Sequence, residues 1–330
     1  MNPRKMAVVG AVVVMLGVSG AMVTPAPASE VAYWTDERAG TISRIGLDGG
    51  AAQIIVSGLS QPAGIAVDAN SGKVYWTDYG YDRIQRANLD GSGREDLIFN
   101  AGLLCPRGIA LDVAQGTMFW VDAGTNKVQS ANLDGSHIAE VTVTDHNLRG
   151  IAVDPKEHKL YWTIFDPGKR KIQRSNYDGS DLQTIITFPD SAGGEPFGIT
   201  LDVDAGKMYW AMASSGYSKI QKANLDGTGI EDVVTGLGIA SGVSLDLAAG
   251  KVYWTDFGSC KIQRVGLDGR MIEDVVWQGM TFPYDIAIAV PEPAMLSLLV
   301  IGGLAILRSR RCAAGTKPRY QMLRKAMAHL

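Results

Sequence analysis

Apolar and polar positions alternate along this chain in short runs, and no helical period appears between residues 29 and 290. Residues 83–88 are typical, since apolar Ile84 and Ala87 stand among polar residues, as in a half-buried strand. An Asp-Gly pair follows such a run, and this pair favours a tight hairpin because glycine adopts a positive φ at low cost. The pattern predicts many short strands joined by tight turns.

The strands recur in a repeat that is marked by tryptophan. Six tryptophans, each preceded by tyrosine or phenylalanine, are spaced by 42, 44, 42, 48 and 44 residues: Trp34, Trp76, Trp120, Trp162, Trp210 and Trp254. Each repeat holds four strand-like pieces, the first a small apolar segment of the P-x-G-I-A-V-D type, as at residues 62–68, 106–112 and 196–202. Four antiparallel strands at this period predict one blade of a β-propeller per repeat.

The two ends of the repeat region indicate how the ring closes. The first unit begins at Val31 with its second strand, and the last unit ends with a spare innermost strand at residues 283–288. Pairing of these two segments would leave no open sheet edge. We therefore expect an all-β fold, a six-bladed propeller of four-stranded antiparallel blades over residues 29–290, whose C-terminal strand completes the first blade.

Residues 1–28 are interpreted as a helical secretory signal peptide. Arg4 and Lys5 precede an apolar run, and small residues offer a cleavage site between Ala28 and Ser29. An uncleaved N-terminal anchor is the alternative. Either interpretation predicts an exported protein, handled by the Sec machinery and, for the cleaved form, by signal peptidase.

Residues 291–311 form a second sorting element in this interpretation. Pro291, Glu292 and Pro293 precede an apolar run at 294–307 and a basic cluster at 308–311, and residues 312–330 are expected to be a basic cytoplasmic tail. The order resembles the PEP-C-terminal signal of bacteria, which implies cleavage near these three residues by an exosortase-like protease. Fourteen apolar residues are few for a span of ~20, which favours a transient helical anchor in the inner membrane. The 19 residues after the arginines depart from that signal, and an ordinary tail anchor is the alternative.

Charge and composition exclude several functions. Residues 29–290 hold 22 basic and 33 acidic residues, a net charge of −11 that would repel nucleic acid. Three scattered cysteines, Cys105, Cys260 and Cys312, are too few for a disulfide framework. The four histidines have no chelating spacing, so we predict neither a metal nor another cofactor.

The aromatic motifs resemble the class B (Y-W-T-D) repeats of the low-density-lipoprotein receptor family over about residues 31–289. The match is complete at 33–36, 75–78 and 253–256, whereas Ile164 and Met212 replace the acid in the fourth and fifth units. The same two blades also carry insertions, at 165–171 and 189–195, so we expect altered loops there. The resemblance implies a propeller that binds a protein on one face of the disc. The epidermal-growth-factor modules of the animal receptors are not found beside it.

A candidate binding site follows from the repeat. One residue per blade, the x of P-x-G, should ring the mouth of the channel: Ala63, Arg107, Arg149, Phe197, Ser241 and Tyr284. The loops after the Y-W-T-D strands should add aromatic side chains: Tyr79, Tyr81, Phe165 and Phe257. Arginines beside aromatic rings suit an acidic glycan or an extended peptide, through charge-assisted hydrogen bonds and stacking.

No nucleophile elbow or phosphate loop occurs in the repeat region, and the recurring aspartates are expected to cap turn amides. We therefore predict a binding module and not an enzyme. It would be an envelope- or matrix-associated scaffold with an extracellular protein or polysaccharide partner, in the periplasm, on the outer surface or in a secreted matrix. One alternative is a periplasmic hydrolase or lyase of the gluconolactonase or N-H-L type. The other is a structural matrix protein without a specific ligand.

Overall fold

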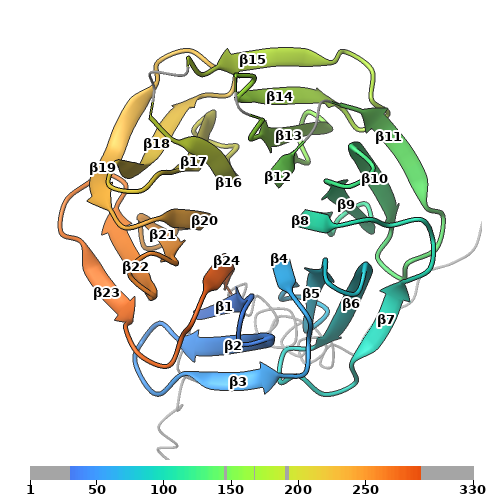
Figure 1. Cartoon of the computed structure of the whole chain (residues 1–330), viewed down its shortest axis with the longest axis horizontal. Helices are drawn as coiled ribbons and strands as arrows, with labels where there is room; N and C mark the ends of the chain where they lie inside the picture. Colours follow the sequence, from blue (N-terminus) through green and yellow to red (C-terminus); the bar gives the residue numbers. More distant parts are fainter. Residues whose placement is uncertain (1–29, 145–146, 167, 190–192, 291–330) are drawn as a thin grey trace, which may run out of the picture. The chain divides into compact units, whose positions relative to one another are not determined.

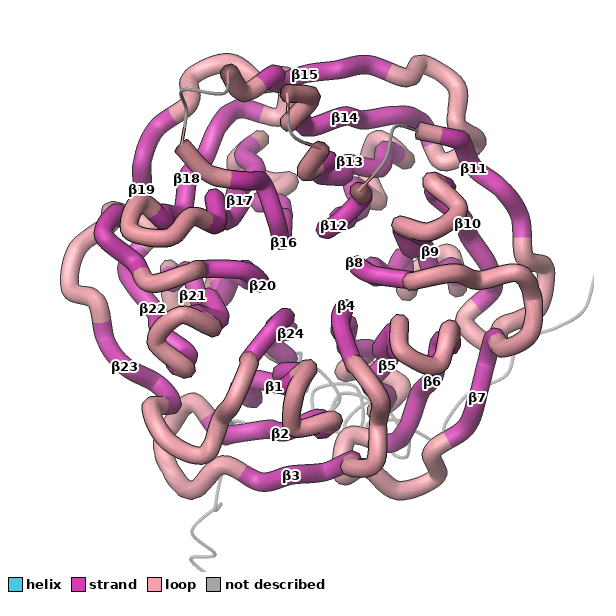
Figure 2. The backbone as a smooth tube through the Cα atoms, viewed as in Figure 1, coloured by secondary structure: helices cyan, strands magenta, loops and turns pink. Residues whose placement is uncertain are grey.

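The computed structural model describes residues 30–144, 147–166, 168–189 and 193–290. Their 24 strands form six four-stranded antiparallel sheets around a central channel, as the sequence predicts (Figure 1). Strands and loops account for all of these residues (Figure 2). The helices expected at 1–28 and 291–311 lie outside the described residues, and within them no helix is long and apolar enough to cross a membrane.

Each sheet extends from an innermost strand at the channel to an outermost strand at the rim. The innermost strands are β24 (Pro283–Ala289), β4 (Pro62–Asp68), β8 (Pro106–Asp112), β12 (Leu148–Asp154), β16 (Glu195–Asp202) and β20 (Ala240–Asp246). Outside them lie β1 (Val31–Asp36), β5 (Lys73–Asp78), β9 (Thr117–Asp122), β13 (Lys159–Ile164), β17 (Lys207–Ala213) and β21 (Lys251–Asp256).

The third strands are β2 (Thr41–Gly46), β6 (Arg83–Asn88), β10 (Lys127–Asn132), β14 (Lys171–Asn176), β18 (Ser218–Asn224) and β22 (Lys261–Gly266). The outermost strands are β3 (Gln53–Val56), β7 (Glu95–Ile98), β11 (Ala139–Val143), β15 (Gln183–Thr187), β19 (Glu231–Leu237) and β23 (Glu273–Val276). The second and third strands of each blade thus hold the aromatic motif and the alternating run found in the sequence.

The predicted ring closure is confirmed by the pairing of β24 with β1, in which Trp34 lies opposite Ile286. The loop before β24 is also held by Asp36. Its carboxylate accepts hydrogen bonds from Thr281 N at 2.6 Å, Thr281 Oγ1 at 2.7 Å and Phe282 N at 3.0 Å. The first and last segments of the propeller therefore form one blade.

The hydrophobic core consists of separate clusters between neighbouring blades, each built around a repeat tryptophan. All six repeat tryptophans are at most 2% exposed. Trp76, for example, packs with Val56 and Ile65 from the neighbouring strands. A buried aromatic side chain of this size removes ~150–250 Å² from water, so the tryptophans hold adjacent blades together.

The tight turns have the expected conformation. Gly91, the glycine of one Asp-Gly pair, has a φ of 86°. The preceding Asp90 carboxylate accepts a hydrogen bond from Ser92 N at 2.9 Å, which confirms that the repeated aspartates cap turn amides. Cys105 and Cys260 are free thiols.

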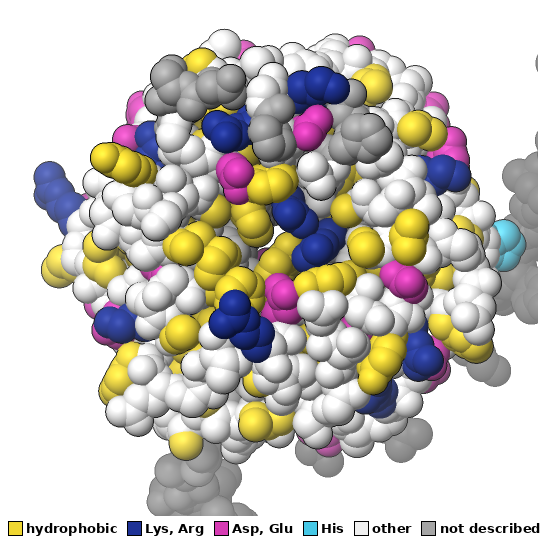
Figure 3. Space-filling view, viewed as in Figure 1, with side chains coloured by type: hydrophobic (Ala, Val, Ile, Leu, Met, Phe, Trp, Pro, Cys, Tyr) yellow, Lys and Arg dark blue, Asp and Glu magenta, His cyan; other side chains and the backbone are white. Residues whose placement is uncertain are grey.

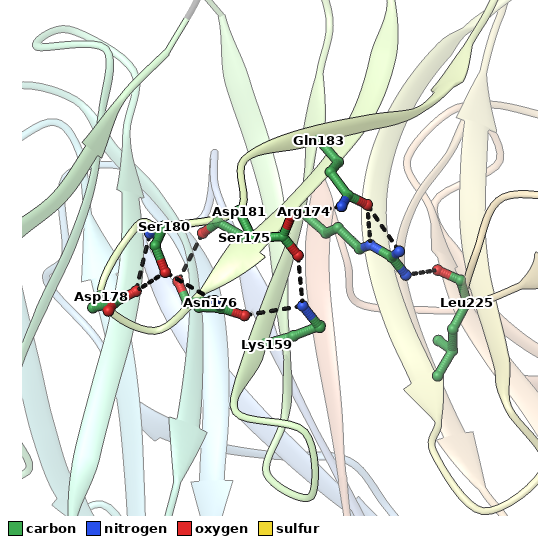
Figure 4. A network of polar contacts seen from close by, with 9 residues as sticks. All are labelled: Lys159, Arg174, Ser175, Asn176, Asp178, Ser180, Asp181, Gln183 and Leu225. Atoms are coloured by element: carbon green, nitrogen blue, oxygen red, sulfur yellow. Dashed lines mark hydrogen bonds and ion pairs between the residues drawn. The ribbon is translucent and has the colours of Figure 1, made fainter.

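Arginine side chains on the third strands connect neighbouring blades (Figure 4). Arg174 Nη1 donates to the carbonyl oxygen of Leu225 in the next blade at 2.9 Å. Its Nε and Nη2 both donate to Gln183 Oε1, at 3.0 and 2.9 Å. Nearby, Lys159 Nζ donates to Asn176 Oδ1 at 2.9 Å. Because the guanidinium group is fixed within its own blade, its third hydrogen bond also fixes the position of the next blade.

Candidate functional site

The channel is formed where the innermost strands approach each other closely. A Cβ atom on Gly64 would lie 2.4 Å from the carbonyl oxygen of Arg107, and one on Gly108 would lie 2.7 Å from that of Arg149. Only glycine permits this approach. Five blades provide it, at Gly64, Gly108, Gly150, Gly198 and Gly242. These glycines line a cavity of about 30 Å³, and a second cavity of about 250 Å³ is lined by the following residues of the same strands.

Arg107 lies at the channel mouth between two tyrosines. Its guanidinium carbon is 3.7 Å from the centroid of the Tyr79 ring, and Nη1 donates to Tyr284 Oη at 3.3 Å. Tyr79 in turn donates a hydrogen bond to the Glu37 carboxylate. Burial, this hydrogen bond and the Glu37 charge all raise the pKa of Tyr79, so its hydroxyl stays protonated in the physiological range.

Arg149 occupies the corresponding position in the next blade, between two phenylalanines. Its guanidinium carbon is 4.7 Å from the Phe165 ring centroid and 5.2 Å from that of Phe197. The Nε atoms of Arg107 and Arg149 are both buried and have no hydrogen-bond partner among the described residues. These two arginines therefore keep donor capacity while aromatic faces hold their positions.

Arg149 also has an acidic neighbour in Glu195, at the start of β16. Burial raises the pKa of Glu195, although the positive charges of Arg170 and Arg149 act in the opposite direction. A partly desolvated carboxyl group beside Arg149 offsets only part of its charge. Figure 3 shows basic, acidic and hydrophobic side chains gathered around the central opening of this face.

The structure brings six of the ten predicted residues together at the mouth, namely Arg107, Arg149, Phe197, Tyr284, Tyr79 and Phe165. It does not present the other four there. Ala63 and Ser241 are 0% and 1% exposed, so neither side chain is presented to the solvent at the mouth. Tyr81 is 53% exposed and lies against Arg83, whereas Phe257 stacks on Phe282 with ring centroids 4.3 Å apart.

Sequence reasoning missed Asp285, which takes the place of the sixth glycine. Its carboxylate accepts hydrogen bonds from Ile65 N at 3.1 Å and Ile286 N at 2.9 Å. Burial in the channel nevertheless raises its pKa to about 7. The signal was present, since Pro283-Tyr284-Asp285 departs from the P-x-G pattern.

The described residues contain no cluster of three or more His, Cys, Asp or Glu side chains that could hold a metal ion. The groups that the structure gathers at the mouth are cationic donors, aromatic faces and a buried carboxyl group.

The fold and the repeated motif define a class, that of six-bladed propellers built from Y-W-T-D repeats. Residues 33–69, 72–113 and 116–155 match the family model described as low-density lipoprotein receptor repeat class B. These three consecutive units therefore carry the class B pattern, as the resemblance in the sequence implies.

One sequence match and one structural superposition involve nidogens. A segment of 68 residues, 20% of this chain, is 47% identical to nidogen-2 of Mus musculus, and it spans only 5% of that protein. A chain in the crystal structure of a nidogen/laminin complex superposes with a TM-score of 0.70 and 25% identity. That superposition covers 81% of this chain and all of the other.

More distant propellers share the fold. A gluconolactonase of Xanthomonas campestris superposes with a TM-score of 0.57 and 20% identity, over 70% of this chain and 84% of the enzyme. Identity at this level shows a common architecture and says nothing about chemistry.

Proposed function

We propose that this chain is an exported binding propeller that holds a short acidic segment of an extracellular protein at its channel mouth. The observation that carries the proposal is the pair Arg107 and Arg149, held over aromatic rings with buried, unpartnered Nε atoms. Such groups bind carboxylates strongly because the guanidinium group offers charge and several donors at once. The net charge of −11 over residues 29–290 favours a short segment over a long polyanion.

The comparisons support a protein as the partner. The matched chain comes from a structure of a nidogen/laminin complex, so a similar propeller takes part in a complex between two proteins. The aromatic residues at the mouth suit an extended peptide, which they can contact without large changes of shape. We propose a binding role and no enzymatic one.

The proposal includes export through a signal peptide at residues 1–28, cleaved between Ala28 and Ser29. It also includes a sorting segment at 291–311, cleaved near Pro291, Glu292 and Pro293, and the envelope or its matrix as the final location. Mass spectrometry of the protein isolated from its native envelope tests both cleavages. Intact ends on a cytosolic product would contradict this part of the proposal.

The binding role is tested with arrays of acidic peptides, neutral peptides and acidic glycans. We expect the full chain to bind acidic peptides and Arg107→Ala/Arg149→Ala to bind them at least tenfold more weakly, since two charge-assisted contacts are lost. The control is Arg94→Ala/Arg270→Ala, which removes two exposed arginines elsewhere. Equal binding by the two double variants would reject the site, and binding of glycans alone would replace the protein partner with a polysaccharide.

A further inference from the structure

Two backbone amides that face the channel are occupied by the protein's own carboxylate. In the sheet registers, Ile65 lies opposite Trp76 and Ile286 lies opposite Trp34. The N–H groups of Ile65 and Ile286 point away from those strands and donate to the two oxygens of Asp285. The position opposite a repeat tryptophan thus directs its N–H group toward the channel.

Four more amides occupy the same position in the other blades. The residues opposite the repeat tryptophans there are Ile109, Ile151, Ile199 and Val243. Because these residues hold the same register position as Ile65, after the same irregularity in the strand, we infer that their N–H groups also face the channel. Each of these nitrogen atoms lies beside the glycine of the neighbouring blade: a Cβ atom built on Gly108, for example, would lie 2.9 Å from Ile151 N. Within the described ranges, none of the four donates to another sheet.

We propose that these four amides, together with Arg149, form a binding site for one carboxylate group, next to the two amides that Asp285 already occupies. The inference rests on the proposed function only for the source of that carboxylate. Asp285 would then be a built-in competitor of the ligand, and not a group that attracts it.

The chemistry of the ring favours an anion. Converging backbone N–H groups present partial positive charge, as in other anion-binding concavities of proteins. The cavity of about 30 Å³ lined by Ile109, Ile151, Ile199 and Arg149 has room for a group the size of one water molecule, so one carboxylate oxygen fits. Asp285 shows that a carboxylate is accommodated by amides of this ring.

Binding of an anion at this site should be coupled to protonation of Asp285. Two carboxylates in one small cavity repel each other, whereas a protonated carboxyl group can donate to the other. The pKa of Asp285 is raised to about 7 by burial, so it gains this proton near neutral pH. The other charged or titratable groups at the mouth are Arg149 on β12 with its neighbour Glu195 on β16, Arg107 on β8 with its neighbour Tyr79, which donates to Glu37, and Tyr284 on β24. The described channel lining from β4 and β20 has none.

Formate is a suitable probe because it stays ionised between pH 6 and 8 and is the smallest carboxylate. We expect formate to shift the ¹⁵N amide resonances of Ile109, Ile151 and Ile199 in the full chain labelled with ¹⁵N-isoleucine. Apparent affinity should fall about tenfold from pH 6 to pH 8, since a group with a pKa near 7 loses its proton over that interval.

Two substitutions of Asp285 test whether its charge competes with the bound anion. Asp285→Asn removes the charge, and Asp285→Gly restores the sixth glycine and frees two amides. Both should bind formate about tenfold more tightly than the wild type at pH 8 and lose most of the pH dependence. Arg149→Ala should weaken binding about tenfold at pH 6, whereas Arg94→Ala should not. The second Asp285 variant keeps the test decisive if the first does not fold.

Weaker binding in both Asp285 variants, or no shift of the three isoleucine amides at pH 6, would overturn the inference. Peptide binding that still depends on Arg107 and Arg149 would then leave the proposed function intact. Acetyl-aspartate amide and glucuronate, tested in the same way, distinguish a peptide carboxylate from that of a glycan.

Discussion

At the scale of single residues, five of the six innermost strands have a glycine at the channel, and the sixth strand has an aspartate at the equivalent position. A side chain on Gly64 or Gly108 would collide with the backbone of the next blade. At the sixth position Asp285 has a side chain, and its carboxylate accepts a hydrogen bond from the amide of Ile65. The carboxyl group is thereby placed in the channel, where burial disfavours its charged form.

The raised pKa of Asp285 predicts a specific dependence of stability on pH. Because the folded state holds the proton more tightly than the unfolded state, this residue stabilises the protein fully below about pH 4, and that contribution is lost as the pH rises through 7. We expect the free energy of unfolding of the wild type, relative to Asp285→Asn, to fall by about 4 kcal/mol between pH 4 and pH 8. Urea titrations of both proteins measure it. Parallel pH profiles of the two proteins would show that the pKa of Asp285 is not raised in the folded state.

At the scale of the elements, the aromatic motif also joins strands through its last two residues. Thr77 Oγ1 accepts a hydrogen bond from Gly64 N at 2.9 Å and donates to the carbonyl oxygen of Arg107 in the next blade. The Asp78 carboxylate accepts hydrogen bonds from Ser60 N and Gln61 N, both at 2.9 Å. The motif thus fixes the start of the innermost strand, where the channel mouth lies.

Replacing the threonine by an isosteric apolar residue should separate this role from packing. Thr77→Val leaves the buried Gly64 N–H without its partner, and we expect a loss of about 1–3 kcal/mol in the free energy of unfolding. The control is Thr125→Val, because the buried Thr125 hydroxyl has no partner among the described residues and its removal should cost nothing. Chemical denaturation of both variants measures this, and equal losses would contradict the assigned role.

The strands and turns could be predicted because each repeat contains an Asp-Gly pair and a tryptophan at a regular spacing. The site could be predicted only in part. Arg107 and Arg149 were found because their place in the repeat puts them at the mouth. Ser241 holds the same position in its repeat, yet it does not reach the mouth. Its short side chain instead donates a hydrogen bond to the carbonyl oxygen of Tyr284. Asp285 was missed because a strand pattern does not show which amides lack partners.

The altered loops expected in blades four and five could also be predicted from the sequence only in part. Met212 lacks the carboxylate that receives loop amides elsewhere, but Ser218 takes over part of its role. The Ser218 hydroxyl donates to the Met212 carbonyl oxygen and accepts a hydrogen bond from Ala240 N, each at 2.9 Å. Such compensation joins residues from three segments, so it becomes visible only in the folded chain.

At the scale of the whole propeller, one blade differs from the others because it is assembled from both ends of the repeat region. In blade three, Asp122 joins segments close in sequence, since it accepts hydrogen bonds from Leu104 N and Thr125 N. Asp36 makes the same kind of connection between residues 245 positions apart. A contact between distant segments closes a much longer loop, whose formation costs more entropy.

Removal of the two aspartates should therefore have different consequences for the ring. We expect Asp36→Ala to lose about 3 kcal/mol in the free energy of unfolding, because three hydrogen bonds to a buried carboxylate disappear at the closure. Amide hydrogen exchange should then accelerate in β1 and β24 together, whereas Asp122→Ala should accelerate exchange in blade three alone. Mass spectrometry of exchanged peptides measures this difference. Unchanged exchange in β24 of Asp36→Ala would mean that strand pairing alone closes the ring and that the Asp36 hydrogen bonds are dispensable.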